Sequence, residues 1–229
     1  NLAAKHGFTR EQQDAFAAES VRRALAAQQS GAFDAEIAPV TVSTRKGDVL
    51  IASDEQPGKC SIDKIPTLRP AFKKDGSITA ASSSSINDGA AALILADHSF
   101  ATELGLTPIA RIVAQAGAAQ APEWFTTAPV AAIQSVLAKA GWQVADVDLF
   151  EINEAFATVA MAPIHELGIS HAKVNIHGGA CALGHPIGAS GARILVTLIH
   201  ALQAKGLRKG VASLCIGGGE ATAVAVELI

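Results

Sequence analysis

The chain has 229 residues, of which 49% are hydrophobic and 17% charged, and its formal net charge is −3 at pH 7. This length allows one large domain or two small ones with a real hydrophobic core. The weak negative charge and the lack of a basic stripe exclude an electrostatic site for nucleic acid. The longest unbroken apolar run, Ala90 to Ala96, is far shorter than the ~18–20 residues that cross a bilayer, so we expect a soluble protein.

The cysteine content indicates free thiols. Cys60, Cys181 and Cys215 are too few for a disulfide framework and show no zinc-ligand spacing. We therefore expect a reducing compartment, the cytoplasm, and no bound metal. The chain starts at Asn1 without an initiator Met or a signal-peptide pattern, which is typical of a piece of a longer protein.

The first part of the chain predicts one long helix followed by an irregular lobe. Thr9 and Gln12 form a capping-box pattern, and the Ala-rich stretch behind them predicts a helix that ends near Gly31. Residues 33–72 favour long loops with short strands at 40–44 and 49–51. The next segment predicts a helix or helix start at 87–92 and a strand at 91–95.

The second part of the chain predicts alternating strands and helices. Pro129 at the start and Gly141 after the end bound one helix in the usual asymmetric manner. The predicted strands are 109–115, 147–152, 174–176, 210–214 and 221–229, and the predicted helices are 129–140, 156–167 and 191–205. The order β-α-β-α-β-α-β-β indicates an α/β architecture.

Unusual residues gather in three short islands of the sequence. They are Asn153 to Phe156, Gly178 to Arg193, and Cys215 to Gly219. Two islands follow predicted strands, and the middle one runs into a helix. Because ligands of open α/β sheets settle beyond the carboxyl ends of strands, the three islands are candidates for one site.

The middle island is rich in glycine, so its backbone can approach a ligand closely, and the helix behind it favours an anionic or oxyanionic group. It lacks the Gly-Lys-Ser/Thr of a phosphate loop and the acidic partner of a dinucleotide fingerprint. A turn forced by close helix–sheet packing is the alternative interpretation. Pro186 biases His185 toward an extended backbone, which places the imidazole at the mouth of the loop.

Cys215 stands where a predicted strand ends and three glycines begin. Its thiol would then lie near backbone N–H groups, which stabilise a thiolate or an oxyanion. A buried, inert thiol is the alternative. Asn153 has a similar alternative, since Asn at a strand-to-helix junction commonly caps the helix. Neither Cys60 nor Cys181 receives a role.

Taken in order, the islands closely resemble the C-terminal half of the thiolases, specifically the acetyl-CoA acetyltransferase (β-ketothiolase) branch. They read Asn-Glu-Ala-Phe, Gly-Gly-Ala-x-Ala-Leu-Gly-His-Pro-Ile-Gly-Ala-Ser-Gly-Ala-Arg and Cys-Ile-Gly-Gly-Gly. Residues 45–48, 68–72 and 87–92 also look like thiolase segments, so the resemblance covers essentially the whole chain. It implies an acyltransferase that condenses two acetyl-CoA reversibly to acetoacetyl-CoA and CoA.

The resemblance also implies a fold and a domain organisation. The family's fold is a duplicated βαβαβαββ unit packed in five layers, α-β-α-β-α. Residues 1–86 would be the remnant of a lid and loop lobe, 87–106 the last strand region of the N-terminal half, and 107–229 the C-terminal half-domain.

The family carries its acyl-accepting cysteine in the N-terminal half, and no cysteine of this chain matches it. We therefore expect the isolated chain to be inactive and to be poorly soluble or to associate. The complete enzyme would be a homodimer or homotetramer without nucleic-acid or membrane partners.

Four residues match the family's catalytic positions. The resemblance implies that His185 activates the nucleophilic cysteine and, as neutral imidazole, helps to bind a thioester oxygen together with a water fixed by Asn153. Cys215 would be the acid and base for the α-carbon or the leaving thiol, and Gly217 a backbone N–H donor of a second oxyanion hole. Losing one such donor costs ~10²–10³ in rate.

The implied contacts with the acyl-CoA substrate follow the same resemblance, and no cofactor beyond coenzyme A thioesters is implied. The residues are Leu68, Phe72, Ala80 and Ser84 along the pantetheine and adenine path, and Phe125, Ala155 and Phe156 beside the acyl pocket. Residues 81–85 and 124–129 depart from the family's usual runs. Lys59 is a candidate cation for the coenzyme phosphates, with a solvated loop lysine as the alternative.

Two other functions share these motifs. A degradative 3-ketoacyl-CoA thiolase for longer chains differs only in pocket dimensions around Phe125 and Phe156. A non-catalytic thiolase-like protein that binds acyl-CoA is the second alternative. The presence of Asn153, His185 and Cys215 argues against the latter.

Overall fold

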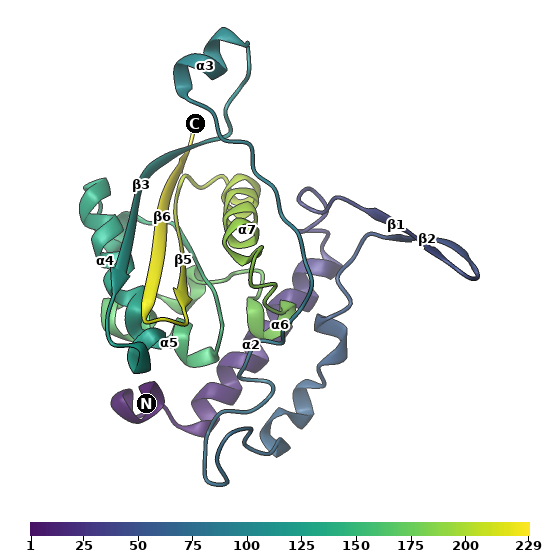
Figure 1. The fold of residues 1–229 in the computed structure, drawn as a ribbon, viewed down its shortest axis with the longest axis vertical. Helices are drawn as coiled ribbons and strands as arrows, with labels where there is room; N and C mark the ends of the chain where they lie inside the picture. Colours follow the sequence, from purple (N-terminus) through teal and green to yellow (C-terminus); the bar gives the residue numbers. More distant parts are fainter.

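The computed structural model describes residues 1–229 and has helices on both faces of a mixed four-stranded sheet (Figure 1). The α-helices are α1 (Leu2–His6), α2 (Arg10–Gln29), α3 (His98–Glu103), α4 (Ala128–Ala140), α5 (Ala157–Leu167), α6 (Ala180–Leu183) and α7 (Ser190–Lys205). The strands are β1 (Val40–Thr44), β2 (Gly47–Ile51), β3 (Ala110–Ala119), β4 (Leu149–Ile152), β5 (Lys209–Ile216) and β6 (Glu220–Leu228). The short 3₁₀ helices are η1 (Pro57–Lys59), η2 (Ile62–Thr67), η3 (Pro122–Thr127), η4 (Val144–Asp146) and η5 (His171–Lys173). None of the helices has the length and apolar character that a membrane crossing needs.

The large sheet has the strand order β3-β6-β5-β4. β4 and β5 are parallel, with Ile152 opposite Ser213, whereas β6 is antiparallel to both of its neighbours. The carboxyl ends of β4 and β5 therefore lie side by side. Residues that follow these two strands meet at one end of the sheet.

The core fills both faces of the sheet. Phe150 and Ile152 pack with α4 and α5 on one face, and Leu149 packs with α7 on the other. This alternation follows from the period of two along a strand. It explains why the short strand β4 is buried along its whole length, including the charged Glu151.

The four long predicted helices, the one that begins after Thr9 and those at 129–140, 156–167 and 191–205, are confirmed in the structure as α2, α4, α5 and α7. Thr9 Oγ1 accepts from Gln12 N, and the Gln12 side chain accepts from Thr9 N, so the capping box begins α2 as expected. The helix predicted from Pro129 begins one residue earlier, and Gly141 ends it with φ of 70°, a conformation that favours glycine.

The helix and strand predicted within residues 87–95 are wrong. This segment is extended and has no strand partner, and Ile94 is 95% exposed. A strand needs a neighbour for its backbone hydrogen bonds, and the chain places none beside it. Figure 1 shows the segment running past the right-hand side of α7 toward α3, which protrudes from the rest.

The strand predicted at 174–176 is also wrong. It shrinks to one bridge between Phe150 and Val174, because Asn175 adopts φ of 48° and turns the chain away from β4. Helix α6, which the sequence pattern did not predict, occupies part of the glycine-rich island. The observed order from β3 onward is β-α-β-α-α-α-β-β.

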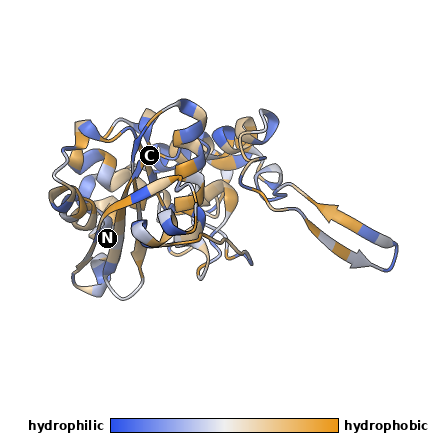
Figure 2. Ribbon diagram, turned by 90° about the horizontal axis from the view of Figure 1, so that it is seen from above, coloured by the Kyte–Doolittle hydropathy of each residue, from blue (hydrophilic) through white to orange (hydrophobic).

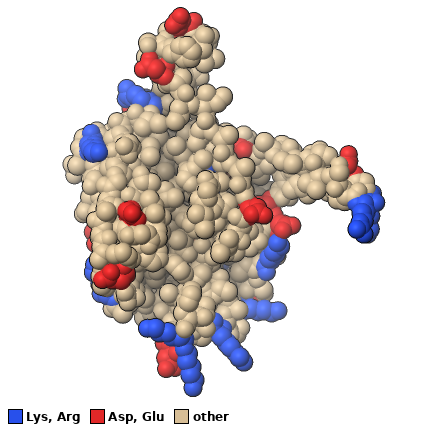
Figure 3. Space-filling view, viewed as in Figure 1, with Lys and Arg blue, Asp and Glu red and all other residues tan.

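The strands predicted at 40–44 and 49–51 form a hairpin that projects from the molecule (Figures 1 and 2). Every residue in both strands is exposed. In Figure 3, Lys and Arg side chains gather at the tip of this hairpin and along the lower edge, while the middle of the same face carries few charges.

Candidate active site

Asn153 and Cys215 lie at the same end of the sheet. Asn153 follows β4 directly, is 1% exposed, and its N–H donates to the carbonyl of Ser213 on β5 at 2.9 Å. Cys215 stands two residues beyond Ser213 on the same strand and is also buried. The parallel pairing of β4 and β5 therefore brings these two predicted residues together.

His185 approaches this end of the sheet from the turn after α6. Its backbone N–H donates to the carbonyl of Ser85 at 2.8 Å, and its Nε2 lies 3.4 Å from Asn153 Nδ2. On the other side of the ring, Nδ1 lies 2.5 Å from Ser190 Oγ. The imidazole is thus held between Asn153 and the first turn of α7.

The hydrogen bonds of Ser190 assign the tautomer of His185. Ser190 Oγ donates its single hydrogen to the Pro186 carbonyl at 3.0 Å, so it accepts from Nδ1–H of His185. Nε2 then carries no hydrogen and presents its lone pair toward Asn153 Nδ2. This arrangement makes Nε2 a base and a hydrogen-bond acceptor.

Burial controls the charge of the groups in the site. Burial, and secondly the positive Arg193, lower the pKa of His185, which favours the neutral ring. Burial also raises the pKa of Cys215 to about 11, against a smaller opposing effect of a backbone hydrogen bond, so the thiol keeps its proton at neutral pH. Asn153 Oδ1 is buried without a partner, and a donor such as water would satisfy it.

The glycines after Cys215 shape the rim of the site. At Gly219, with φ of 105°, an added Cβ would lie 2.3 Å from the Gln120 carbonyl oxygen, so only glycine fits. At Gly217 an added Cβ would meet nothing within 4 Å. Space is therefore open on the side of Gly217 where a Cβ would stand.

Four of the predicted substrate-contact residues lie together. The N–H and Oγ of Ser84 both donate to the carbonyl of Ala155 at 3.1 Å, and Ser83 forms a bridge with Phe156. The Phe72 and Phe156 rings are 6.3 Å apart between their centroids in an edge-to-face pair. The irregular lobe is thus docked on the Asn-Glu-Ala-Phe island.

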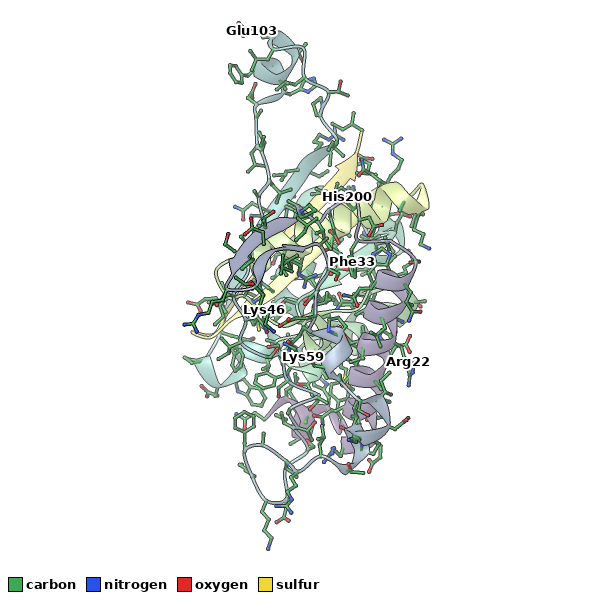
Figure 4. All side chains as sticks on the ribbon, turned by 90° about the vertical axis from the view of Figure 1, so that its right-hand side faces the viewer. Arg22, Phe33, Lys46, Lys59, Glu103 and His200 are labelled. Atoms are coloured by element: carbon green, nitrogen blue, oxygen red, sulfur yellow. The ribbon has the colours of Figure 1, made fainter.

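The other predicted contacts are placed separately. Leu68 packs beside Ile65 and α2, and Ala80 is exposed. Phe125 is half-buried in η3, which contacts β5 and α5. Lys59, labelled in Figure 4, forms an exposed ion pair with Glu55 at 2.6 Å, which favours the solvated alternative.

Several buried polar residues around the site were not predicted from the sequence. Ser190, Glu154 and Asn175 are each at most 2% exposed. Their position inside or beside the three islands was the available signal. Glu151 was missed too: burial outweighs Arg193, whose Nη1 lies 3.6 Å from Glu151 Oε2, and raises its pKa to about 8. No cluster of three or more His, Cys, Asp or Glu side chains is placed to hold a metal ion.

The chain is thus an α/β protein with a buried Asn153 and Cys215 at the ends of two adjacent parallel strands and with His185 beside Asn153. The chain belongs to the thiolase family. The thiolase N-terminal domain model matches residues 1–99, and the thiolase C-terminal domain model matches residues 106–228. The resemblance drawn from the three islands is therefore confirmed.

Individual relatives point to one branch of the family. The chain is 52% identical to an acetyl-CoA acetyltransferase of Allochromatium vinosum over 229 residues, and 53% identical to a probable acetyl-CoA acetyltransferase of Dictyostelium discoideum. Each match includes 99% of this chain, but only 58% of the first relative and 55% of the second. The chain thus spans little more than half the length of the curated relatives that it matches.

Solved structures confirm the thiolase-like fold. The acetyl-CoA acetyltransferase of Bacillus anthracis superposes with a TM-score of 0.96 at 45% identity, over 100% of this chain and 58% of that one. Human mitochondrial 3-ketoacyl-CoA thiolase superposes with a TM-score of 0.92 at 38% identity, over the same shares.

Proposed function

We propose that the chain forms part of an acetyl-CoA acetyltransferase, which converts two acetyl-CoA reversibly to acetoacetyl-CoA and coenzyme A. The observation that carries the proposal is the free Nε2 of His185, 3.4 Å from the Asn153 amide at the sheet end that also holds Cys215. A base, a fixed amide and a buried thiol at one place are what a Claisen condensation of thioesters needs.

In the first half-reaction, His185 Nε2 accepts the proton of the acyl-accepting thiol, which we assign to sequence outside residues 1–229. The resulting thiolate attacks the thioester carbon, and the bond between the acetyl carbon and the coenzyme A sulfur breaks. The leaving sulfur takes the proton of Cys215. The products are an acetyl-enzyme, free coenzyme A, a protonated His185 and a Cys215 thiolate.

In the second half-reaction, the Cys215 thiolate removes a proton from the methyl carbon of a second acetyl-CoA. The enolate carbon attacks the acetyl-enzyme, and the expelled thiolate regains its proton from His185. During this step Nε2–H of His185 and a water held by Asn153 Oδ1 stabilise the enolate oxygen. The N–H of Gly217 stabilises the oxyanion of the tetrahedral intermediate that forms when the enolate carbon attacks the acetyl-enzyme.

The shifted pKa values support these roles. The lowered pKa of His185 keeps Nε2 available as a base. The raised pKa of Cys215 makes its thiolate a stronger base than an ordinary thiolate, which suits the weak acidity of an acetyl methyl group. The unpartnered Asn153 Oδ1 supports a bound water at the same place.

The proposal includes the substrate and the surroundings of the enzyme. An acetyl group is the preferred acyl unit, because relatives 52% and 53% identical carry the acetyl-CoA acetyltransferase name. Coenzyme A thioesters are the only small molecules required. Free cysteines support a cytoplasmic location, and the exposed hairpin supports a homo-oligomer. Residues 1–86 are proposed as the lid remnant, 87–106 as the segment that would supply the last strand of the N-terminal half when that half is present, and 107–229 as the C-terminal half-domain.

A thiolysis assay tests the activity. The chain is co-expressed with the part of the Allochromatium vinosum relative that it does not match, and acetyl-CoA formed from acetoacetyl-CoA and CoA is quantified. We expect turnover that falls by at least about 10²-fold in Cys215→Ala and His185→Ala. Cys60→Ala, a matched thiol control in the lobe, should retain it. Absence of turnover in the unaltered protein would contradict the proposal.

Two further assays define the details. Radiolabelled acetyl-CoA given to the chain alone should leave no stable label on the protein, and stable labelling would reveal a nucleophile among its own side chains. A series of 3-ketoacyl-CoA substrates of rising length should show the highest kcat/KM for acetoacetyl-CoA. A preference for longer chains would favour the degradative alternative.

A further inference from the structure

Glu154 is a buried carboxylate that no step of the proposed reaction uses. It is 1% exposed, and it directly follows Asn153 at the end of β4. Both of its oxygens accept hydrogen bonds. Oε1 accepts from Asn175 Nδ2 at 2.8 Å, and Oε2 accepts from Ser20 Oγ at 2.7 Å and from the N–H of Cys181 at 3.1 Å.

These three donors come from three separate segments of the chain. Ser20 lies on the long helix α2, Asn175 in the turn after η5, and Cys181 in the first turn of α6. Asn175 also uses its side chain to pair with the N–H and the carbonyl of Ile152, both at 2.8 Å, and so holds the end of β4. Glu154 therefore joins the lobe helix, the strand end and the segment that leads to His185.

The fit around Glu154 is close. An added Cβ at Gly179 would lie 2.3 Å from the Glu154 Cδ, so the backbone of this glycine packs directly on the carboxylate. The N–H of Gly179 donates to Ser20 Oγ at 2.9 Å. Ser20 Oγ thus accepts from Gly179 N–H and donates its hydrogen to Glu154, so the direction of both hydrogen bonds is assigned.

We propose that Glu154 is a positioning residue, which fixes Asn153 and His185 relative to each other by tying the end of β4 to α6 and α2. Asn153 directly precedes Glu154 in the sequence. Glu154 also holds the first turn of the short helix α6, and His185 follows that helix. The inference rests on the proposed function only where turnover is measured, since the geometry concerns this chain alone.

Replacement by glutamine tests whether both acceptor oxygens are needed. Glu154→Gln keeps the size of the side chain but turns one oxygen into an NH₂ donor. If the NH₂ faces Asn175, it meets another donor. If it faces Ser20 and Cys181, it meets a backbone N–H and a hydroxyl that already accepts from Gly179. Either orientation loses at least one bond and loosens the link to His185.

The readout is the reactivity of His185 toward diethyl pyrocarbonate, which modifies the unprotonated ring. The rate at His185 is followed against pH by peptide mass spectrometry on the full chain. In the unaltered protein the profile should report a pKa below the usual ~6.5. In Glu154→Gln we expect the pKa to return toward ~6.5 and the limiting rate to rise severalfold, because water reaches a less firmly held ring.

The controls separate positioning from stability. Glu166→Gln neutralises a carboxylate that pairs with His6 at 3.0 Å, away from this network, and should leave the His185 profile unchanged. Ser20→Ala removes one of the three hydrogen-bond partners of Glu154. It should shift the pKa of His185 in the same direction as Glu154→Gln does, but by a smaller amount. A melting curve checks that each variant is folded, and Glu154→Asp, which keeps two acceptor oxygens, should partly restore the profile if glutamine unfolds the chain.

Turnover gives a second, independent measurement. In the thiolysis assay Glu154→Gln should lower kcat about tenfold with little change in KM, because it displaces reacting groups and not the coenzyme. If the unaltered protein shows no turnover, the proposed function fails while the His185 profile still decides the inference. An unchanged His185 profile in a folded Glu154→Gln protein, or a pKa shifted downward, would overturn it.

Discussion

At the residue scale, burial dominates the electrostatics of this protein. Cys215, Glu151 and His185 are all shifted toward their neutral forms, with burial as the largest cause in each case. For Glu151 this holds although Arg193 lies 3.6 Å away, because removing a carboxylate from water costs more than one imperfect ion pair returns. Both His185, the proposed base, and Cys215, the proposed acid, are therefore favoured in their neutral forms.

The raised pKa of Cys215 predicts how its thiol reacts. Alkylation of Cys215 by iodoacetamide, mapped by mass spectrometry, should rise about tenfold per pH unit and level off only near pH 11. Free cysteine under the same conditions should level off near ~8.5. A profile for Cys215 that matches the free amino acid would show that the thiol is not desolvated.

Glu151 predicts a pH-dependent stability. Its pKa is about 8 in the folded chain against an ordinary 4.5, so protonation favours the folded state. This contribution is present below about pH 4.5 and is lost as the pH rises toward 8. Glu151→Gln stays neutral at every pH and does not lose this contribution. As the pH is raised from about 5 to about 8.5, its free energy of unfolding should therefore increase by about 1–3 kcal/mol relative to that of the unaltered chain. The measurement is urea unfolding at both pH values, and a difference that does not change with pH would refute it.

The sequence could assign residue types to the site but not their contacts. Asn153, His185 and Cys215 stand in motifs that indicated their chemistry, and parallel pairing of β4 and β5 was enough to bring two of them together. The tautomer of His185 depends on Ser190, five residues away, whose hydroxyl is aimed by the Pro186 carbonyl. Such a contact follows from the first turn of α7 and is invisible in a pattern of residue types.

At the element scale, the sequence predicted correctly those helices whose start or end is set by residues within or next to the helix itself. Helices α2 and α4 carry their own caps, so the pattern around Thr9 and Gly141 was sufficient. Residues 91–95 are a short apolar run, which led to the predicted strand, but a strand depends on a partner and no other segment pairs with this one. The short strand expected at 174–176 failed because Asn175 turns the backbone after a single bridge.

The capping box of α2 predicts a measurable contribution to stability. Thr9→Ala removes the acceptor of the Gln12 N–H and should cost about 1 kcal/mol in the free energy of unfolding. Ser61→Ala is the matched control, because Ser61 stands at the N-cap of η2 without a side-chain cap bond. Equal losses in the two variants would show that the Thr9 hydroxyl does not cap the helix.

At the scale of the whole molecule, the projecting hairpin is the least covered element. Val40, Val42, Val49 and Ile51 lie on one face of the two strands, and all four are exposed. An isolated two-stranded hairpin is marginally stable in water, and an exposed apolar face of this kind marks a contact surface. A second copy of the protein would cover it in the homo-oligomer that we propose.

Sedimentation velocity tests this contact. The chain should associate as its concentration rises, and a charged pair on the apolar face, Val42→Lys with Val49→Glu, should weaken the association about tenfold or more. Thr41→Lys on the opposite face is the control and should leave it intact. A chain that stays monomeric at every concentration would contradict both the contact and the expectation that the isolated chain associates.

The most direct test of the central claim is a crystal structure of the protein with acetyl-CoA bound. We predict that the thioester oxygen lies beside His185 and within hydrogen-bond distance of a water on Asn153 Oδ1, with Cys215 Sγ facing the methyl carbon. A thioester seated elsewhere, or a Cys215 sulfur directed into the core away from it, would contradict the account.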